Sequence, residues 1–349
     1  LFIQQKSQMY CNITPIKPNK NAQIFIIGKN SDIIDRETIM NKHIRFNDEV
    51  KKAILSKKPL VALESTIIAH GMPFPQNIAM ANHVEAIVRE CGAAPATIAV
   101  IGGEIRVGCD DDALEYLGKS GREIPKAGKR DLPYLIAKKM DGATTVGATA
   151  YIAAMVGIPV FATGGIGGVH RDAEKTFDIS NDLEVIAECN IAVVSAGAKA
   201  ILDLPRTLEY LETKGVEVIG YRTDFFPAFY TAKSPHRVNH RLNTPKEIAG
   251  YLSVKNELGI KSGVLIANPI PEELELKNEE IDAKIAEAVK TAREENITGK
   301  DLTPYLLFKI KELTAGRSLD ANIVLVYNNA YLAATIAKEL KENEKEPKI

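Results

Sequence analysis

Hydrophobic residues follow two alternating patterns from about Phe46 onward, one typical of strands and one typical of helices. Short apolar runs predict strands over 60–63, 96–101, 104–107, 158–162, 192–195, 216–221 and 263–267. Apolar residues at helical spacing predict helices over 47–56, 76–90, 110–117, 148–156, 200–213, 278–295, 303–314 and 318–341. This alternation indicates an α/β fold with three layers (α/β/α), a largely parallel central sheet and a C-terminal part rich in helix.

Local signals add detail to this outline. The pair Gly102-Gly103 between two strand patterns predicts a hairpin turn. Asp131 precedes Leu132 and Pro133 and is expected to cap a helix at its N-terminus. The long uncharged segment 142–169 reaches the length of a membrane span, but its glycines and a proline divide it into a helix, a strand and a loop. It is expected to form buried core.

The chain divides into three parts by pattern. Residues 1–44 lack the alternation and are expected to be an N-terminal extension that is disordered or carries a targeting signal. The extension has neither an apolar signal core nor the Arg-rich, acid-poor pattern of a good transit peptide. Residues 45–341 are expected to form a single α/β domain, and residues 342–349 a charged tail.

Composition narrows the classes of partner. The chain has 44 basic and 45 acidic residues, with no basic stripe of the kind that binds a nucleic-acid backbone. The four cysteines contain no CxxC pair, which argues against a disulfide framework and a zinc site. We therefore expect a small-molecule ligand, no nucleic-acid polymer, no membrane, and a reducing compartment, with the cytoplasm first and an organelle second.

Polar residues follow several of the predicted strands. In parallel α/β sheets ligands bind beyond the carboxyl ends of the strands, so these residues are candidates for a site. Glu64 follows 61–63, Lys126 follows 123–125, Thr163 follows 159–162, and Lys199 follows 192–195. A carboxylate, two lysines and a glycine-rich loop are thus expected to converge on one cleft.

Lys199 is the most informative of these residues, because it ends an apolar run of small residues. Desolvation disfavours the charged form of a lysine, and a neutral amine can attack an electrophilic carbon and form a Schiff base. The alternative is a lysine that ends a strand and pairs with a nearby acid.

The loop 165–170 likewise has two readings, an anion-binding nest of backbone amides or a chain reversal with glycines at positive φ.

Several blocks of residues together resemble the pseudouridine-5'-phosphate glycosidase family, also called the indigoidine synthase A-like family. They occur in family order across about residues 46–340. The blocks are ALESTIIAHGMP (62–73), TGGIGGVHR (163–171), DISNDL (178–183), VSAGAKAILD (194–203), SLDANI (318–323) and NNA (328–330).

This resemblance implies an enzyme that reversibly cleaves the carbon–carbon glycosidic bond of pseudouridine 5'-phosphate to uracil and ribose 5-phosphate. Carbon is a poor leaving group, so the ordinary carboxylate pair of glycosidases is not sufficient. By the family pattern Lys199 is the nucleophile that forms a Schiff base with the ring-opened sugar, and Glu64 is the proton donor. A glutamate in an enclosed site can have its pKa raised, which suits that role.

The resemblance also implies a divalent metal, Mn²⁺ or alternatively Mg²⁺ or another ion, at Asp178. A single carboxylate with waters is typical of such oxygen-preferring ions. The family forms homotrimers. Further residues match positions that contact the substrate: Lys126, Val146, Thr163, His170, Ser180, Asn181, Asp182 and Asn322.

Structural roles remain open for several of these residues. Glu64 could cap a turn, Ser180 or Asn181 could cap a helix, His170 could bond a carbonyl, and Asn322 could bridge helices. Two other functions also stay open. One is an aldolase-like lyase that shares the Schiff-base lysine, and the other is a nucleotide-binding protein without catalytic activity.

Overall fold

The structure is a computed structural model that describes residues 41–344, apart from the side chains of Asn278 and Lys300. The first described strand, β1 (Ile44–Phe46), pairs with a later strand of the sheet. Ile44, which the sequence analysis placed in the N-terminal extension, is therefore part of the fold. Residues 1–40 and 345–349 lie outside the described residues, so the expectations for the rest of the extension and for the end of the tail stay predictions.

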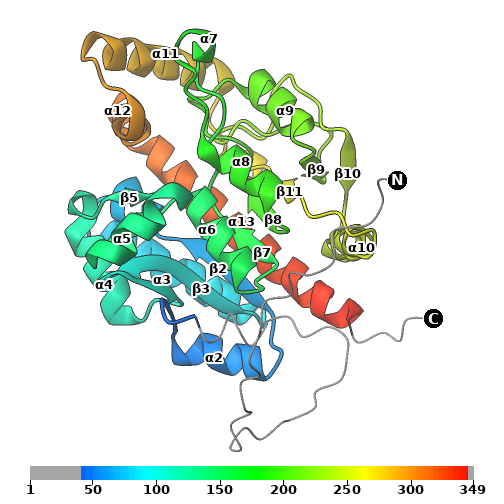
Figure 1. The fold of residues 1–349 in the computed structure, drawn as a ribbon. Coiled ribbons are helices and arrows are strands. Elements are labelled where there is room, and N and C mark those ends of the chain that lie inside the picture. Colours follow the sequence, from blue (N-terminus) through cyan, green and yellow to red (C-terminus); the bar gives the residue numbers. More distant parts are fainter. Residues whose placement is uncertain (1–40, 345–349) are drawn as a thin grey trace, which may run out of the picture. The chain divides into compact units, whose positions relative to one another are not determined.

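The described strands form one sheet of eleven strands, drawn in Figure 1. Along its main path the order is β1-β4-β3-β2-β7-β8-β11-β9-β10, and β6 joins β5 to β3. Only β3–β4 and β3–β6 are antiparallel, which confirms the predicted largely parallel sheet. The bounds after β1 are β2 (Leu60–Glu64), β3 (Ala94–Ile101), β4 (Glu104–Val107), β5 (Lys126–Ala127), β6 (Gly142–Thr144), β7 (Val160–Ala162), β8 (Ala192–Ser195), β9 (Glu217–Tyr221), β10 (His240–Leu242) and β11 (Val264–Ala267).

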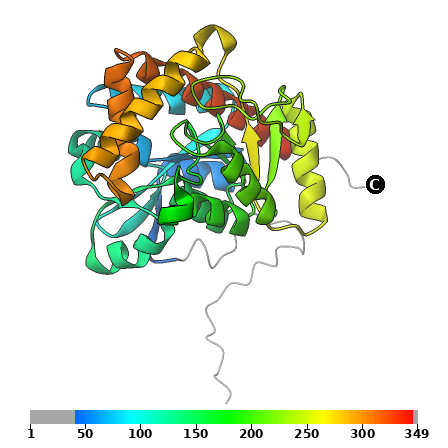
Figure 2. The same ribbon diagram turned by 90° about the horizontal axis from the view of Figure 1, so that it is seen from above.

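Helices cover both faces of the sheet. The helices are α2 (Asp48–Leu55), α3 (Gln76–Glu90), α4 (Asp111–Ser120), α5 (Leu132–Lys138), α6 (Val146–Met155), α7 (Ala173–Thr176), α8 (Asn181–Glu188), α9 (Leu204–Thr213), α10 (Pro245–Glu257), α11 (Asn278–Glu294), α12 (Leu302–Leu313) and α13 (Arg317–Asn343). Helices α6 and α8 pack together on one face, and α13 packs with α3 and α10 on the other (Figure 1). Helices α11 and α12 pack side by side at one end of the sheet (Figures 1 and 2). The three-layer architecture is as predicted.

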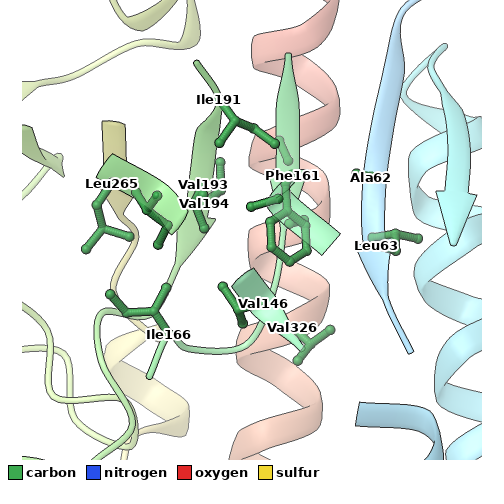
Figure 3. Packing of buried hydrophobic residues seen from close by; sticks show 14 of the residues in the cluster. Ala62, Leu63, Val146, Phe161, Ile166, Ile191, Val193, Val194, Leu265 and Val326 are labelled. Atoms are coloured by element: carbon green, nitrogen blue, oxygen red, sulfur yellow. The ribbon is translucent and has the colours of Figure 1, made fainter. Parts of the chain in front are cut away.

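The core lies where the central strands meet these helices. Every residue of β2, β7, β8 and β11 is buried, as expected for parallel strands covered on both faces. Figure 3 shows Phe161 of β7 beside Val193 and Val194 of β8, with Leu265 of β11 in the same cluster. The short apolar runs of the sequence are therefore the centre of the sheet.

The uncharged segment 142–169 is interior, as predicted. It supplies β6, α6 and β7, and the residues of β6 and β7 are all buried. Within residues 41–344, no helix combines the length and the apolar character needed to cross a bilayer. The hairpin at Gly102-Gly103 is also confirmed, because both glycines have positive φ, +59° and +77°, between antiparallel strands.

Helix ends differ from the prediction at two places. Asp131 does not cap α5, because its carboxylate accepts a hydrogen bond from the Gly128 amide (2.9 Å) in the preceding 3₁₀ turn. The helix expected directly after Lys199 begins only at Leu204, since Asp203 caps it and residues 199–202 form turns and a bridge.

Three kinds of element in the structure were not predicted from the sequence pattern. Strands β6 and β10 are short, and β5 has two residues, too few to show a period. The short π-helical turn η1 (Ile67–Gly71) follows β2 directly. Helix α10 was not predicted either, although Thr244 and Glu247 form a capping box on either side of Pro245, a signal that predicts a helix start.

Candidate active site

Three neighbouring parallel strands deliver the central candidate residues to one edge of the sheet. Glu64 is the last residue of β2, Thr163 follows β7, and Lys199 lies four residues after β8. β2 pairs with β7, and β7 pairs with β8, all in parallel. Because the carboxyl ends of parallel strands meet at the same edge, the predicted convergence of these residues is observed.

Glu64 is buried and bonded to its neighbour. The hydroxyl of Thr163 donates a hydrogen bond to Oε1 of Glu64, so the carboxyl does not cap a turn. Burial raises the pKa of Glu64, while the positive charge of Lys199 acts in the opposite direction. A carboxyl in this environment can hold a proton at a higher pH than an exposed one, as a proton donor requires.

Lys199 is half-buried on a turn that extends the sheet. Its backbone amide donates to the carbonyl of Ile166 (3.1 Å), and the Ile166 amide donates to Gly197 (3.1 Å). Gly197 has φ +80°, and an added Cβ would lie 2.4 Å from the carbonyl oxygen of Pro227, so only glycine fits there. Within residues 41–344 no ion pair within 4.0 Å involves Lys199, although its positive charge lowers the pKa of Glu64 and that of His170. The described residues do not support the reading of Lys199 as a paired structural lysine.

Lys126 reaches the same edge by a different route from the one predicted. It does not follow a strand but begins β5, which is parallel to β6, while β6 is antiparallel to β3. The start of β5 therefore lies beside the carboxyl ends of the main strands. Lys126 is aligned with Ala143 of β6, which pairs with Ala99, one residue past the partner of Glu64. The positive charge of Lys126 lowers the pKa of Glu64 and that of His170.

One of the two predicted readings of the glycine-rich loop is wrong. No glycine from 164 to 168 has a positive φ, so the loop is not a glycine-dependent reversal. The amides of Ile166, Gly167, Val169 and His170 bond to protein acceptors and do not contribute to an anion-binding nest, which stays a prediction for the rest of the loop. The glycines are there because neighbours leave no room for a Cβ, which at Gly167 would lie 2.1 Å from Oγ of Ser180.

Asp182 joins two of the segments that surround the site. Its Oδ1 accepts from the Gly147 amide (2.7 Å) in the first turn of α6, and its Oδ2 accepts from the Gly167 amide (2.9 Å). A negative group near a helix N-terminus is favourable. The buried carboxylate thus fixes the loop against α6, and both oxygens that the family pattern would offer to substrate are bonded to backbone.

His170 and Asp178 lie at the outer side of the cluster. The His170 amide donates to the Asp178 carbonyl (3.0 Å), and Nδ1 of His170 lies 3.9 Å from Oδ2 of Asp178. Burial lowers the pKa of His170, against the effect of the neighbouring carboxylate. The side chain of Asp178 is about a third exposed, and no group of three or more His, Cys, Asp or Glu residues fit to hold a metal occurs in residues 41–344.

The remaining predicted contacts lie at helix starts or in a helix. Ser180 caps α8, as one of the two readings predicted, and Asn181 is its exposed first residue. Val146 is the buried first residue of α6. Asn322 lies within α13 and is 7% exposed, yet its Oδ1 has no hydrogen-bond partner among the described residues. A buried acceptor without a partner is rare and points to a missing donor.

A cleft of about 410 Å³ lies beside Asn322 and was not predicted. Its walls come from η1, the end of α4, α12 and α13, and include His70, Arg122 and Tyr230. Lys199 and Glu64 do not line it, and Glu64 with Thr163 lines a separate cavity of only about 20 Å³. His70 belongs to block 62–73 of the resemblance, so its position there was the one available signal.

We call Glu64, Lys126, Thr163, His170 and Lys199 the polar cluster. It combines a buried carboxyl of raised pKa, two lysines and an imidazole within electrostatic range of one another. An amine, an acid and a cation are the groups that covalent chemistry on a sugar phosphate requires.

The chain is similar to proteins of one family. A family model described as "Indigoidine synthase A like protein" matches residues 49–339. A pseudouridine-5'-phosphate glycosidase of Caldanaerobacter subterraneus is 58% identical, and one of Clostridium botulinum is 52% identical. Each match spans 307 residues, which is 88% of this chain and 100% of the relative.

Two solved structures share the fold. The prealnumycin C-glycosynthase AlnA in complex with ribulose 5-phosphate has a TM-score of 0.80 and 36% identity, covering 87% of this chain and 99% of that chain. An indigoidine synthase A-like protein of Thermotoga maritima has a TM-score of 0.78 and 33% identity, covering 91% and 100%.

Proposed function

The chain belongs to the indigoidine synthase A like family, and we propose that it reversibly cleaves the carbon–carbon glycosidic bond of pseudouridine 5'-phosphate to uracil and ribose 5-phosphate. The relatives that carry the glycosidase name match along their whole length at 52–58% identity. The related structure titled a C-glycosynthase holds a pentose phosphate, which is the same class of sugar. The observation that carries the proposal is the placement of Glu64 and Lys199 at the same edge of the sheet, after strands on either side of β7, with the charge of Lys199 acting on the pKa of Glu64.

The proposed chemistry uses Lys199 as the nucleophile. Nζ of Lys199 forms a bond to C1' as the bond from C1' to the ring oxygen opens, and the proton that the amine loses passes to that oxygen. The electron pair of the C1'–C5 bond then passes to C5 of uracil, which takes a proton, while the nitrogen lone pair forms an iminium at C1'. Water hydrolyses the iminium to ribose 5-phosphate and restores the amine.

The other residues of the site bind and move protons in this proposal. Glu64 donates the proton that the base takes up, since burial raises its pKa. Lys126 pairs with the substrate phosphate. Thr163, His170, Ser180 and Asn181 contact the sugar phosphate, and Val146 and Asn322 the remainder of the nucleotide. Asp182 acts on the substrate through the two backbone segments that it holds.

A divalent ion at Asp178 is a further part of the proposal. A carboxylate that is about a third exposed, with one imidazole nearby, fits a largely hydrated ion and does not fit a closed all-protein site. Mn²⁺ is the first candidate, with Mg²⁺ as the alternative. Such an ion would supply positive charge next to the anionic substrate.

The family resemblance also leads us to propose a homotrimer. Light scattering on the purified chain tests this assembly, and a monomer would contradict it. A cytoplasmic location stays a prediction.

Chemical trapping tests the covalent step. Sodium borohydride added with ribose 5-phosphate reduces an iminium to a stable amine, so peptide mapping of the full chain should find an adduct on Lys199. Lys199→Arg keeps the positive charge but is not expected to form the adduct. Absence of an adduct on the unaltered chain, with Mn²⁺ supplied, would overturn the Schiff-base proposal.

Turnover tests the substrate. Incubation of the chain with pseudouridine 5'-phosphate and Mn²⁺ should change the ultraviolet absorbance as uracil is released, and Lys199→Arg should abolish this change. An adduct on Lys199 without release of uracil would favour the aldolase-like alternative instead. Turnover that survives Lys199→Arg would contradict the assignment of the nucleophile.

A further inference from the structure

His70 is placed between the polar cluster and the cleft. It lies in η1, six residues after Glu64, and it lines the cleft together with Asn322. The turn η1 is π-helical, a form that occurs mostly as single turns and often at functional sites. The positive charge of Lys126 lowers the pKa of His70 as well as that of Glu64, so the imidazole is within electrostatic range of the polar cluster.

The hydrogen bond of His70 fixes which ring nitrogen can accept. Nε2 lies 2.9 Å from the carbonyl oxygen of Ile124. A carbonyl oxygen can only accept, so Nε2 carries the hydrogen, and in a neutral imidazole Nδ1 is then an acceptor. Burial lowers the pKa of His70, and the charges of Lys126 and Arg122 act in the same direction, against the hydrogen bond to Ile124 and the charge of Asp301, which raise it. Nδ1 has no hydrogen-bond partner within the described part of the chain.

Asn322 offers a second acceptor to the same cleft. Its side chain is more than nine-tenths buried, and no described residue donates to Oδ1. Asn322 lines the cleft, and its Oδ1 lies next to Gly164, where an added Cβ would be 3.2 Å from this oxygen. The buried Oδ1 of Asn322 therefore requires a donor, and Nδ1 of the partly buried His70 is a second acceptor on the same cleft, so together they point to a ligand that carries two donors.

A pyrimidine linked through carbon has that pattern. In pseudouridine the sugar is attached to C5, so N1 and N3 of the ring both carry hydrogen. In uridine the sugar occupies N1, and only N3 can donate. A site with two acceptors therefore matches the carbon-linked isomer and leaves one acceptor unpaired with the nitrogen-linked one, which is an effective means of discrimination.

We propose that the cleft binds the pyrimidine ring and that His70 is a specificity-determining residue, whose Nδ1 accepts from one ring N–H while Oδ1 of Asn322 accepts from the other. This inference rests on the proposed function, because it concerns the base of the same substrate. His70 does not take part in the covalent step. It selects nucleotides whose base presents two N–H donors.

Two variants separate the acceptor from the shape of the ring. His70→Phe removes the acceptor, whereas His70→Gln retains an amide that can donate to Ile124 and an oxygen that can accept. We expect kcat/KM for pseudouridine 5'-phosphate to fall about tenfold or more in His70→Phe, the loss of about one hydrogen bond, and to be largely restored in His70→Gln. His83→Phe is the matched control, because His83 packs on Tyr327 outside the cleft.

Methylated substrates test whether His70 selects the base or only supports the fold. Pseudouridine 5'-phosphate methylated at N1 or at N3 lacks one donor, and the unaltered chain should discriminate against both. In His70→Phe the penalty for one of the two methyl groups should disappear, while the penalty for the other should remain. A purely structural role of His70 would leave both penalties unchanged and would overturn the inference.

Borohydride trapping separates this inference from the proposed function. Ribose 5-phosphate carries no base, so His70→Phe should form the Lys199 adduct as readily as the unaltered chain does. If the unaltered chain neither traps the sugar nor releases uracil, the proposed function fails. If it does both and His70→Phe behaves identically with all three nucleotides, only the assignment of His70 fails.

Discussion

The polar cluster and the cleft lie next to each other but are held by different kinds of structure. The cluster is set by strand register, because β2, β7 and β8 are adjacent and parallel and end at the same edge. The cleft is set by packing between helices that are far apart in sequence, with η1 on one side and α12 and α13 on another. Strand register fixes reacting groups, and helix packing leaves space for a ligand.

This difference predicts where substitutions act. Changes in the cluster should affect the chemical step, since strand register and main-chain hydrogen bonds fix where its residues begin. Changes in the cleft should affect which base is accepted, as the His70 variants test. Three further substitutions examine the cluster side, and a variant that altered base selection from there would contradict this division.

Glu64→Gln is expected to cause the largest loss. Glutamine keeps the oxygen that accepts from Thr163 but has no acidic proton to transfer. We expect kcat for release of uracil to fall about 10²–10⁴-fold, the usual contribution of a general acid. The discrimination between N1-methylated and unmethylated substrate should stay as in the unaltered chain. Retention of full kcat would remove Glu64 from the reaction.

The same variant should become more stable than the unaltered chain as the pH rises. Because burial raises the pKa of Glu64 above its value in the unfolded chain, the folded state binds more protons between the two pKa values. The free energy of unfolding of the unaltered chain therefore falls as pH rises through that window, and glutamine removes the fall. Urea unfolding of both proteins at about pH 5 and about pH 8 measures this pH dependence of the free energy of unfolding. Equal pH dependence in both proteins would contradict a raised pKa.

Asn329→Leu should have the next largest effect. Asn329 is fully buried in α13, its Nδ2 donates to the Thr163 carbonyl (2.8 Å), and its Oδ1 accepts from Asn268 (2.9 Å). Leucine leaves both partners unsatisfied, at about 1–3 kcal/mol each. We expect a matching loss in urea unfolding and a fall in kcat of about tenfold or more as Thr163 shifts.

Asn328→Leu is the control for this change. Asn328 precedes Asn329 on the same helix, and its amide also bonds a backbone carbonyl, that of Pro269 (3.0 Å), but it does not reach Thr163. It should lose stability with little change in kcat. Equal kcat in the two variants would show that Asn329 does not position the cluster.

Asp178→Asn should give the smallest loss. If a divalent ion binds there, the amide weakens its binding by about 10–100-fold, and kcat should recover at high Mn²⁺. Asp172→Asn in the same loop is the control, because Asp172 pairs with Arg293 and is expected to leave the Mn²⁺ requirement unchanged. Titration of activity with Mn²⁺ measures both. An unchanged requirement in Asp178→Asn would exclude this residue as a ligand.

The sequence predicted the fold where the pattern is long. The central strands are short apolar runs that end in polar residues, and both features are visible in the sequence. β5 and β6 have two and three residues, so no period could reveal that they reverse direction and bring Lys126 to the site. The capping box of α10 was available and was overlooked.

Part of the site was predictable because the central strands are visible in the sequence. Register places Glu64, Thr163 and Lys199, so the sequence suffices for them once the strands are known. The cleft depends on how α12 packs near η1, and no local pattern encodes that distance. The bonds of Asp182 to Gly147 and Gly167 are equally invisible, because they join residues 35 and 15 positions apart.

The glycine loop is a meeting point of four separate elements. A single methyl group at Gly164, Gly165, Gly167 or Gly168 would press on Asn322 of α13, on Phe229, on Ser180 or on Thr207 of α9, respectively. An engineer who wishes to change the accepted base should therefore leave this loop untouched. The helical wall of the cleft is the better place for redesign, because a side chain there can be exchanged without displacing the residues that perform the reaction.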